Sequence, residues 1–364
     1  MATIYDVAKR AGVSPKTVSR VLNGDAPVSK KTRETVTAAM EELGYVPSHA
    51  ARSIKSNRSN LVGLITGAIS NAEEAVTSAG LPELFIVQGA QAVIEQSGKT
   101  LLISDTGGRI DRVPGLVRTF QQHRVEGILY VADFHKPLDV KLPGDGLKTV
   151  LVNCFDDRGT PAVVPDDEAG QYHLVRAVLE AGHRRIAYLT LASAMQATRL
   201  RLKGYRTALS EASIDFDPAL IHATDLFGSP GEDQLVWNAI DSLLNLEARP
   251  TAICCGNDRL AMAVYGILRK RGIAVPEEMS VVGFDDHRLI SEGLYPTLTT
   301  AELPYSAMGA RAAQVLLNML SDPETKQQNE PIRVSGQIRH RGSLVAPAAS
   351  TKDNIIDLTG RKER

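Results

Sequence analysis

Two basic side chains, Lys16 and Arg20, lie four residues apart in the stretch GVSPKTVSRVLNG at positions 12–24. On a helix that spacing places both side chains on one face. Arginine and lysine can donate hydrogen bonds to O6 and N7 of guanine in the major groove of DNA, and short polar side chains suit phosphate oxygens. The pattern predicts a helix that reads DNA bases, and the alternative interpretation is an ordinary solvated helix face.

Three short helices are predicted to position these side chains. Apolar residues recur at helical spacing in each, for example Val18, Val21 and Leu22 in the second. A short helix, a tight connection and a second short helix, braced by a third, form a helix-turn-helix. The residues expected to begin or end these helices are Thr3, Gly12, Ser14, Pro15, Ser29 and Gly44.

The charge of the chain is divided between this region and the rest. Residues 1–58 carry ten basic and five acidic side chains, a net charge of +5, whereas the remaining residues carry 31 basic and 37 acidic side chains, a net charge of −6. A basic head on a mildly acidic body indicates a polyanionic partner for the head alone. The candidate DNA-binding residues are Thr3, Tyr5, Ser14, Pro15, Lys16, Thr17, Ser19, Arg20, Asn23, Ser29 and Ile54.

The stretch that follows the head has little apolar surface of its own. Ser48 could cap a short helix that runs to about Lys55, but such a helix would be marginal alone. If it forms on DNA, Ile54 is placed to act as an apolar wedge in the minor groove. The alternative is a flexible linker.

Length and composition bound the class of protein. A chain of 364 residues predicts two or three domains. The sequence has no apolar run near the ~18 residues of a membrane span and no secretory signal at its start. Its three cysteines, Cys154, Cys254 and Cys255, make no disulfide framework. We expect a cytoplasmic protein without a metal or cofactor.

The body alternates between buried strands and helices, which predicts an α/β fold with parallel sheets. So many strands indicate two sheets that face one another. Helices are expected between the strands, for example at 83–97, 169–181 and 259–272. The predicted strands are 61–67, 100–105, 127–132, 149–153, 185–190, 251–256 and 280–285.

The sequence resembles the lactose-repressor/galactose-repressor (LacI/GalR) family of bacterial transcription regulators in several stretches. The match is specific in TIYDVAKRAGVSPKTVSRVLNG and VSKKTRETVTAAMEELGYVPSHAARSIKS. It continues through DDEAG at 166–170, RLRLKGYRTAL at 199–209, PTAICCGND at 250–258 and SVVGFDD at 280–286. The resemblance implies a homodimer on pseudo-palindromic double-stranded operator DNA, with Lys16 and Arg20 as base readers. It also implies a periplasmic-binding-protein-like core of two lobes, crossed by the chain three times.

These expectations define the domains. The helix-turn-helix head spans 1–47, the hinge or linker 48–59, the effector-binding and dimerisation core 60–348, and a flexible tail 349–364. The first lobe comprises about 60–163 and 296–323, and the second about 164–295 and 324–348. The chain crossings are expected near 163–166, 290–298 and 321–331.

A ligand is expected beyond the carboxyl ends of the strands, where the sequence places polar residues. The resemblance implies that Arg201 grips the ligand, and a guanidinium offers paired donors to vicinal hydroxyls or a carboxylate. Asn257 and Asp285 suit a polyol, although both could instead cap the turns that follow them. The candidate effector-binding residues are Asn71, Asp133, Asn153, Phe155, Arg201, Leu226, Phe227, Asn257 and Asp285.

One segment departs from the family pattern. Residues 72–82, AEEAVTSAGLP, resemble an insertion at the mouth of the expected cleft, which could cover the effector, meet the partner subunit or be a plain surface loop. The stretches SGKT at 97–100 and DTG at 105–107 are incomplete phosphate-loop and aspartic-protease patterns. No nucleophile–base pair is readable, so we do not expect an enzyme.

The sequence therefore predicts a DNA-binding transcription regulator, most readily a repressor, controlled by a small polar effector such as a sugar. One alternative is the same regulator with a nucleobase or a partner protein as co-repressor. The alternative from another class is a solute-binding protein, which the basic head and the missing signal peptide disfavour.

Overall fold

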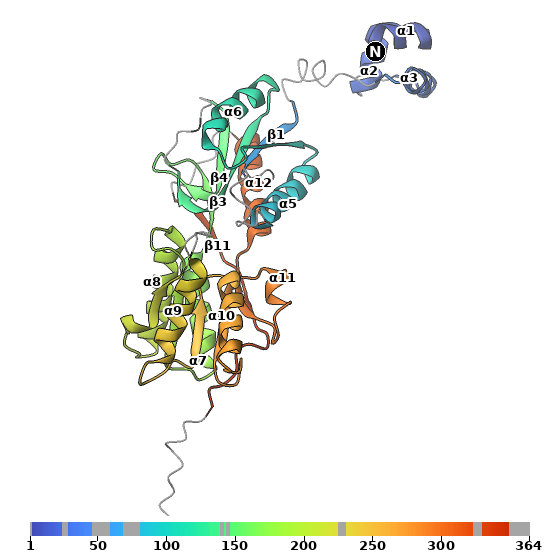
Figure 1. Cartoon of the computed structure of the whole chain (residues 1–364). Helices are drawn as coiled ribbons and strands as arrows, with labels where there is room; N and C mark the ends of the chain where they lie inside the picture. Colours follow the sequence, from blue (N-terminus) through green and yellow to red (C-terminus); the bar gives the residue numbers. More distant parts are fainter. Residues whose placement is uncertain are drawn as a thin grey trace, which may run out of the picture.

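The computed structural model describes residues 2–23, 28–45, 59–67, 81–138, 142, 146–224, 231–322 and 330–348. In these ranges the chain forms a three-helix head and two α/β lobes, each built on one six-stranded sheet (Figure 1). The predicted fold class is confirmed. No helix of the described part is long and apolar enough to cross a membrane.

Local side-chain caps define the first helix of the head, α1 (Ile4–Ala11). Thr3 Oγ1 accepts a hydrogen bond from the backbone N–H of Asp6 at 3.3 Å, and the Asp6 carboxylate accepts one from the N–H of Thr3 at 2.8 Å. Gly12 then adopts the left-handed conformation, with a φ of 64°, and ends the helix. The predicted start and end of this helix are confirmed.

The next two helices of the head begin at serine caps. Ser14 Oγ accepts from the N–H of Thr17 at 3.1 Å at the start of α2 (Pro15–Asn23). Ser29 Oγ accepts from the N–H of Thr32 at 3.2 Å at the start of α3 (Lys30–Glu42). The three helices enclose a small core of Val7, Ala8, Val18, Val36 and Ala39.

The first lobe is built on a sheet in the order β11-β5-β4-β3-β1-β2, in which every pairing is parallel. Helices α5 (Leu81–Gln96) and α12 (Tyr305–Ser321) cover one face, and α6 (Val113–Gln122) covers the other after the short η1 (Ile110–Arg112). The strands are β1 (Leu61–Thr66), β2 (Thr100–Asp105), β3 (Gly127–Pro137), β4 (Lys148–Phe155), β5 (Ala162–Pro165) and β11 (Ile332–Val334).

The second lobe has the order β12-β10-β9-β8-β6-β7, and only the β10–β12 pairing is antiparallel. The strands are β6 (Ile186–Thr190), β7 (Ile221–Ala223), β8 (Ala252–Cys255), β9 (Ser280–Asp285), β10 (Thr299–Glu302) and β12 (Ile338–Arg339). The remaining elements of this lobe are α7 (Asp167–Glu180), α8 (Gln196–Glu211), η2 (Pro218–Leu220), α9 (Glu232–Leu244), α10 (Asp258–Lys270) and α11 (Arg288–Ser291).

Alternating side chains of each buried strand pack on opposite faces of the second sheet. Cys255 packs with the α9 and α10 side, whereas Cys254 packs with the α7 and α8 side. Both thiols are fully buried and unbonded, and burial raises the pKa of Cys254 to about 12. The interpretation of this pair as core packing is confirmed.

Two of the three predicted chain crossings are wrong in position. The first lies between β5 and α7, within the predicted stretch. The second follows β10, because residues 299–302 pair with β9 in the second sheet and the chain reaches the first lobe only with α12. The third follows β11, because residues 332–334 pair with β5 in the first sheet. These strands are short, and their pairing partners are distant in the sequence.

The backbones of α5 and α12 touch in the first lobe. A Cβ atom at Gly89 would lie 1.9 Å from the carbonyl oxygen of Ser306, and one at Gly309 would lie 1.9 Å from that of Ile86. Both positions therefore require glycine for this close helix packing.

Candidate functional site

The exposed face of α2 presents the predicted base-reading side chains. Lys16 and Arg20 are exposed one helical turn apart, and within the described part of the chain neither has an ion pair or a hydrogen bond. Thr17 and Ser19 are half-buried beside them, while Val18 on the opposite side is fully buried in the core of the head. The helix thus offers two cations to a partner, and no described residue pairs with either of them.

The other candidate DNA contacts surround this face or lie outside the described residues. Pro15 is exposed at the start of α2, and Tyr5 is 72% exposed on α1. Thr3, Ser14 and Ser29 cap the N-terminal ends of the three helices, and their side chains accept hydrogen bonds from the first turn of each helix. The side chain of Asn23 and the whole of Ile54 lie outside the described residues, as does the predicted hinge helix from Ser48 to Lys55.

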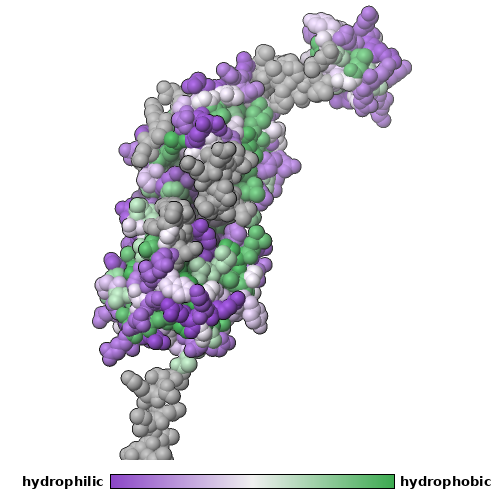
Figure 2. Space-filling model, in the orientation of Figure 1, coloured by the Kyte–Doolittle hydropathy of each residue, from purple (hydrophilic) through white to green (hydrophobic). Residues whose placement is uncertain are grey.

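The head and the lobes differ in the hydropathy of the surface that Figure 2 shows. The outer edge of the head is mostly hydrophilic there, whereas hydrophobic surface gathers along the side of the two lobes on which α5 and α11 lie (Figures 1 and 2). The exposed large apolar residues of the second lobe include Met262, Leu289 and Tyr295, of which the last two are 79% and 89% exposed. This surface differs in kind from the polar face of α2.

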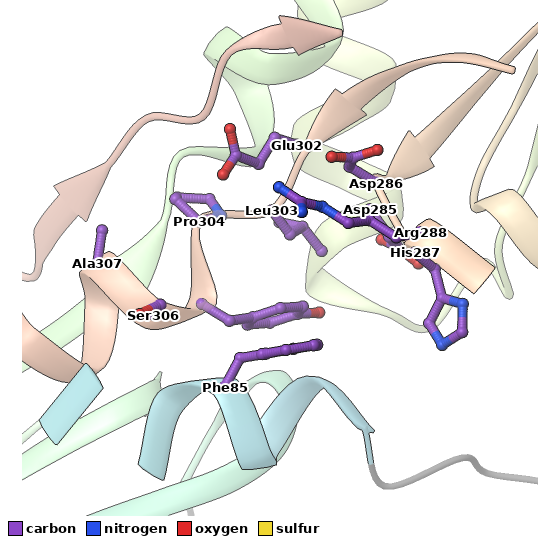
Figure 3. Close-up of a pocket in the computed structure, with 11 residues that line it drawn as sticks. Phe85, Asp285, Asp286, His287, Arg288, Glu302, Leu303, Pro304, Ser306 and Ala307 are labelled. Carbon is purple, nitrogen blue, oxygen red and sulfur yellow. The ribbon is translucent and has the colours of Figure 1, made fainter. Parts of the chain in front are cut away.

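A pocket of about 380 Å³ lies between the two lobes, where the chain crosses from β10 to α12. Phe85 rises from α5 on the first lobe, and the segment from Asp285 to Arg288 enters from the end of β9 on the second (Figure 3). The complete lining is Phe85, Asp285, Asp286, His287, Arg288, Glu302, Leu303, Pro304, Tyr305, Ser306 and Ala307. The pocket therefore combines aromatic surface with carboxylate, imidazole and guanidinium groups.

The strand end in this pocket has an unusual backbone. Asp285 has a φ of 121° and Asp286 a φ of 53°, backbone angles that residues other than glycine seldom adopt. Asp286 is fixed by hydrogen bonds from Arg341, at 2.7 Å, and from Ser291, at 3.0 Å. The turn holds both aspartates in the lining of the pocket, and the effector-binding role of Asp285 stays a prediction.

Behind the pocket, Asp258 is fully buried at the start of α10. Its two oxygens accept hydrogen bonds from Thr300 Oγ1 and from the backbone N–H of His287, both at 2.7 Å. Burial raises the pKa of Asp258 to about 7, although those two hydrogen bonds act in the opposite direction. The buried carboxyl of Asp258 thus fixes the backbone of the turn at His287.

Arg201 of α8 is buried, with 3% of its surface exposed, and it does not reach out with a free guanidinium. Its Nε donates to Asp167 Oδ1 at 2.7 Å and its Nη1 to the carbonyl oxygen of Gly256 at 2.6 Å. The guanidinium also lies over the ring of Phe284, 3.7 Å from its centroid. Burial lowers the pKa of Arg201, but Asp167 and then Asp285 outweigh it and leave the pKa raised.

The same Asp167 bridges the two lobes. Its second oxygen lies 2.7 Å from Nδ1 of His135, which belongs to β3 of the first lobe. Burial alone would raise the pKa of Asp167, but Arg201 and His135 together lower it below its ordinary value. The result is a buried chain of three ionisable side chains, His135, Asp167 and Arg201, across the lobes.

The remaining predicted effector residues are dispersed. Asn257 caps α10, with its side-chain oxygen accepting from the N–H of Leu260 at 2.7 Å, so the capping interpretation holds for it. Asn153 is buried, and its side-chain nitrogen donates to the carbonyl oxygen of Ala132 at 3.2 Å. Phe155 is half-buried, and its ring meets the ring of His135 edge to face. Asn71, Leu226 and Phe227 lie outside the described residues, as do residues 72–80 of the expected insertion.

The predicted strand at 127–132 is too short, so Asp133 does not lie beyond its end. The strand continues to Pro137 because its pairing with β4 shifts between Val131 and Lys136. Asp133 lies within this irregular stretch, is exposed and forms an ion pair with Lys136 at 2.5 Å. The same irregularity places His135 toward the second lobe.

Most residues of the site carry no mark in the sequence. The stretch DDEAG, which contains Asp167, serves only as evidence for the family resemblance. No sequence pattern predicts a role for His135, Phe85 or Tyr305. A buried partner for Arg201 could have been sought among nearby acidic residues, because an unpaired buried arginine is costly. In the described part of the chain, no group of three or more histidine, cysteine or acidic residues could hold a metal ion.

The chain is similar to known transcription repressors over nearly its whole length. Residues 3–48 match the bacterial regulatory proteins of the lacI family, and residues 175–344 match the periplasmic binding protein-like domain. The HTH-type transcriptional repressor PurR of Vibrio atlanticus is 32% identical over 334 residues, 90% of this chain and 95% of that protein. The ribose operon repressor of Escherichia coli is 32% identical over 351 residues, 94% of this chain and 100% of that protein.

A solved structure extends the similarity to three dimensions. The lac repressor dimer bound to operator and the anti-inducer ONPF matches with a TM-score of 0.75 and 26% identity, over 95% of this chain and 99% of that one.

Proposed function

Because the chain belongs to the lacI family of bacterial regulatory proteins and is thus a DNA-binding transcription regulator, we propose that it acts in the cytoplasm as a homodimeric repressor of a pseudo-palindromic operator. A small polar effector, most readily a sugar, binds between its lobes and changes its affinity for DNA. The observation that carries this proposal is the pairing of an exposed basic face on α2, without an ion pair among the described residues, with a pocket between the lobes that holds carboxylate, imidazole and guanidinium groups.

Lys16 and Arg20 are the proposed base readers. The full-length protein should enrich a pseudo-palindromic site from a random duplex library, and Arg20→Ala should change which bases it prefers. Arg33→Ala is the matched control, because it removes one exposed cation of the head from α3 instead of α2. If Arg20→Ala and Arg33→Ala enrich the same sequence as the unaltered protein, the base-reading role of Arg20 is wrong.

The homodimer is supported by the exposed apolar residues of the second lobe. Met262, Leu289 and Tyr295 are large apolar side chains exposed to solvent, and a partner subunit would bury them. Analytical ultracentrifugation should show a dimer, and Leu289→Asp with Tyr295→Asp should shift the population toward monomer. A monomer at micromolar concentration in the unaltered protein would contradict this part of the proposal.

The effector is assigned to the pocket between the lobes. A thermal-melt panel of neutral sugars, polyols, nucleobases and sugar acids should reveal it, since a ligand at ~100 times its Kd stabilises by about 2.7 kcal/mol. Asp285→Asn should weaken the shift, whereas Asp157→Asn, at an exposed site elsewhere, should not. A shift that survives Asp285→Asn unchanged would place the ligand elsewhere.

A nucleobase is the second candidate effector. Phe85 and Tyr305 line the pocket, and aromatic rings can stack on a flat base. The same thermal-melt panel separates the two candidates. If the effector is a nucleobase, purines should raise the melting temperature and sugars should not.

A further inference from the structure

The arginine expected to grip the effector already has a counter-ion. Arg201 and Asp167 are 3% and 1% exposed, and 2.7 Å separates Nε of the one from Oδ1 of the other. The carboxylate has little freedom to swing away, because His135 binds its second oxygen from the first lobe. The pair is thus fixed from both sides of the cleft.

This pairing restricts what the guanidinium can do for a ligand. A side-on bidentate grip on a carboxylate or phosphate uses the single hydrogen of Nε together with one terminal nitrogen. In Arg201 that hydrogen is donated to Asp167, and Nη1 also donates to the carbonyl oxygen of Gly256. Arg201 does not itself line the pocket, but its guanidinium lies over the ring of Phe284, the residue before the lining residue Asp285, and its side-on grip is already closed by Asp167.

The local charge points the same way. Two carboxylates, Asp167 and Asp285, act on this one guanidinium, and Asp285 also lines the pocket. An anionic ligand that approached Arg201 would meet repulsion from both carboxylates in a region with little water to screen it. A hydroxyl or carbonyl group would meet no such penalty.

We propose that Asp167 is a specificity-determining residue, a built-in counter-ion of Arg201 that makes the cleft select an uncharged polar effector over an anionic one. The inference rests on the proposed function of the cleft as the effector site. It narrows that function to neutral sugars, polyols, nucleosides or bases, and excludes phosphorylated or acidic sugars.

The test is a gain of anion binding. Asp167→Asn keeps the shape of the side chain but removes its charge, and inorganic phosphate is the probe, at constant ionic strength adjusted with sodium chloride. We expect phosphate to raise the melting temperature of the variant by several degrees at concentrations that leave the unaltered protein unchanged. The double variant Asp167→Asn with Arg201→Met should lose this response, which would locate the anion at Arg201.

Several outcomes would overturn the proposal. It is wrong if phosphate stabilises the unaltered protein as much as the variant, or if neither Asp167→Asn nor the smaller Asp167→Ser gains a phosphate response. It is also wrong if both variants fail to fold, because Asp167 is then a structural group. Failure of the proposed function is distinguishable, since it shows instead as neutral compounds that bind without any effect on DNA affinity.

Discussion

The head and the cleft use the same residue type in opposite ways. Arg20 is exposed on α2 and, within the described residues, has no ion-pair partner. Arg201 is buried, and a carboxylate, a carbonyl oxygen and an aromatic ring surround it. One arginine keeps its charge available to an outside partner, and the charge of the other is neutralised within the protein.

The difference matches the two partners. DNA is a polyanion, so an uncompensated cation on an exposed helix gains affinity from every phosphate it approaches, with a strong dependence on salt. A neutral effector offers only hydrogen-bonding groups, so the cleft needs a fixed polar frame without a net attraction for anions. Substitutions in the two regions should therefore have effects of different kind and size.

The largest expected effect is on stability. Arg201→Ala leaves Asp167 buried beside His135 without its main counter-charge, which should cost roughly 3–5 kcal/mol of unfolding free energy. Arg20→Ala should change stability by less than about 0.5 kcal/mol, because it removes an exposed side chain. Urea denaturation of both variants measures the contrast, and equal losses would contradict it.

The second effect concerns a buried carboxyl whose oxygens are bound by a hydroxyl and a backbone N–H, not by an arginine. The pKa of Asp258 is raised from 3.8 to about 7, so the folded state holds its proton more tightly than the unfolded state does. Its contribution to stability is therefore present near pH 4 and is lost as the pH rises toward 7, by roughly 2–4 kcal/mol in all.

Asp258→Asn should flatten that dependence, because an amide does not titrate. Unfolding free energies at pH 5.5 and pH 8 for the two proteins give the measurement. An unaltered difference between the two pH values in the variant would assign the dependence to other groups. Asp167 is the contrasting case: its pKa is lowered, so its stabilising contribution is present above about pH 4 and is lost as the pH falls below that range.

The third effect is on DNA binding. Arg20→Ala should weaken binding to the selected duplex by about 1–3 kcal/mol and relax the preference at one base pair. Lys16→Ala should do the same if Lys16 reads a base; if it contacts only phosphate, the variant instead lowers the slope of log Kd against log salt by about 1. Fluorescence anisotropy at several salt concentrations separates the two, and unchanged affinity in both variants would refute the role of α2.

The smallest effect tests the frame of the head. Thr3→Ala removes the side-chain cap of α1 and should cost about 1 kcal/mol in the stability of the head. Asp167, which is buried between the two lobes, should be unaffected, so the phosphate response should stay absent. Hydrogen exchange of the α1 amides reports the loss, and exchange as slow as in the unaltered protein would show that the cap is dispensable.

The sequence predicts the head better than the cleft for a physical reason. The caps of the head helices join residues three positions apart, such as Thr3 and Asp6, and helix α1 ends at Gly12 itself. Both signals can be read from neighbouring residues. Arg201 and Asp167 are 34 residues apart, and Asp167 and His135 are 32 apart, so only the folded sheets bring them together. The shift in strand pairing that brings His135 to the cleft leaves no local pattern in the sequence.

The central claim is that an uncharged molecule in the cleft controls how the exposed cations of the head bind DNA. Titration of the full-length protein on its selected duplex, with and without each compound that raises its melting temperature, tests this most directly. The account predicts that a neutral polar compound changes the Kd for DNA by roughly 5- to 150-fold. If every stabilising compound leaves the Kd for DNA unchanged, the cleft does not control the head and the account is wrong.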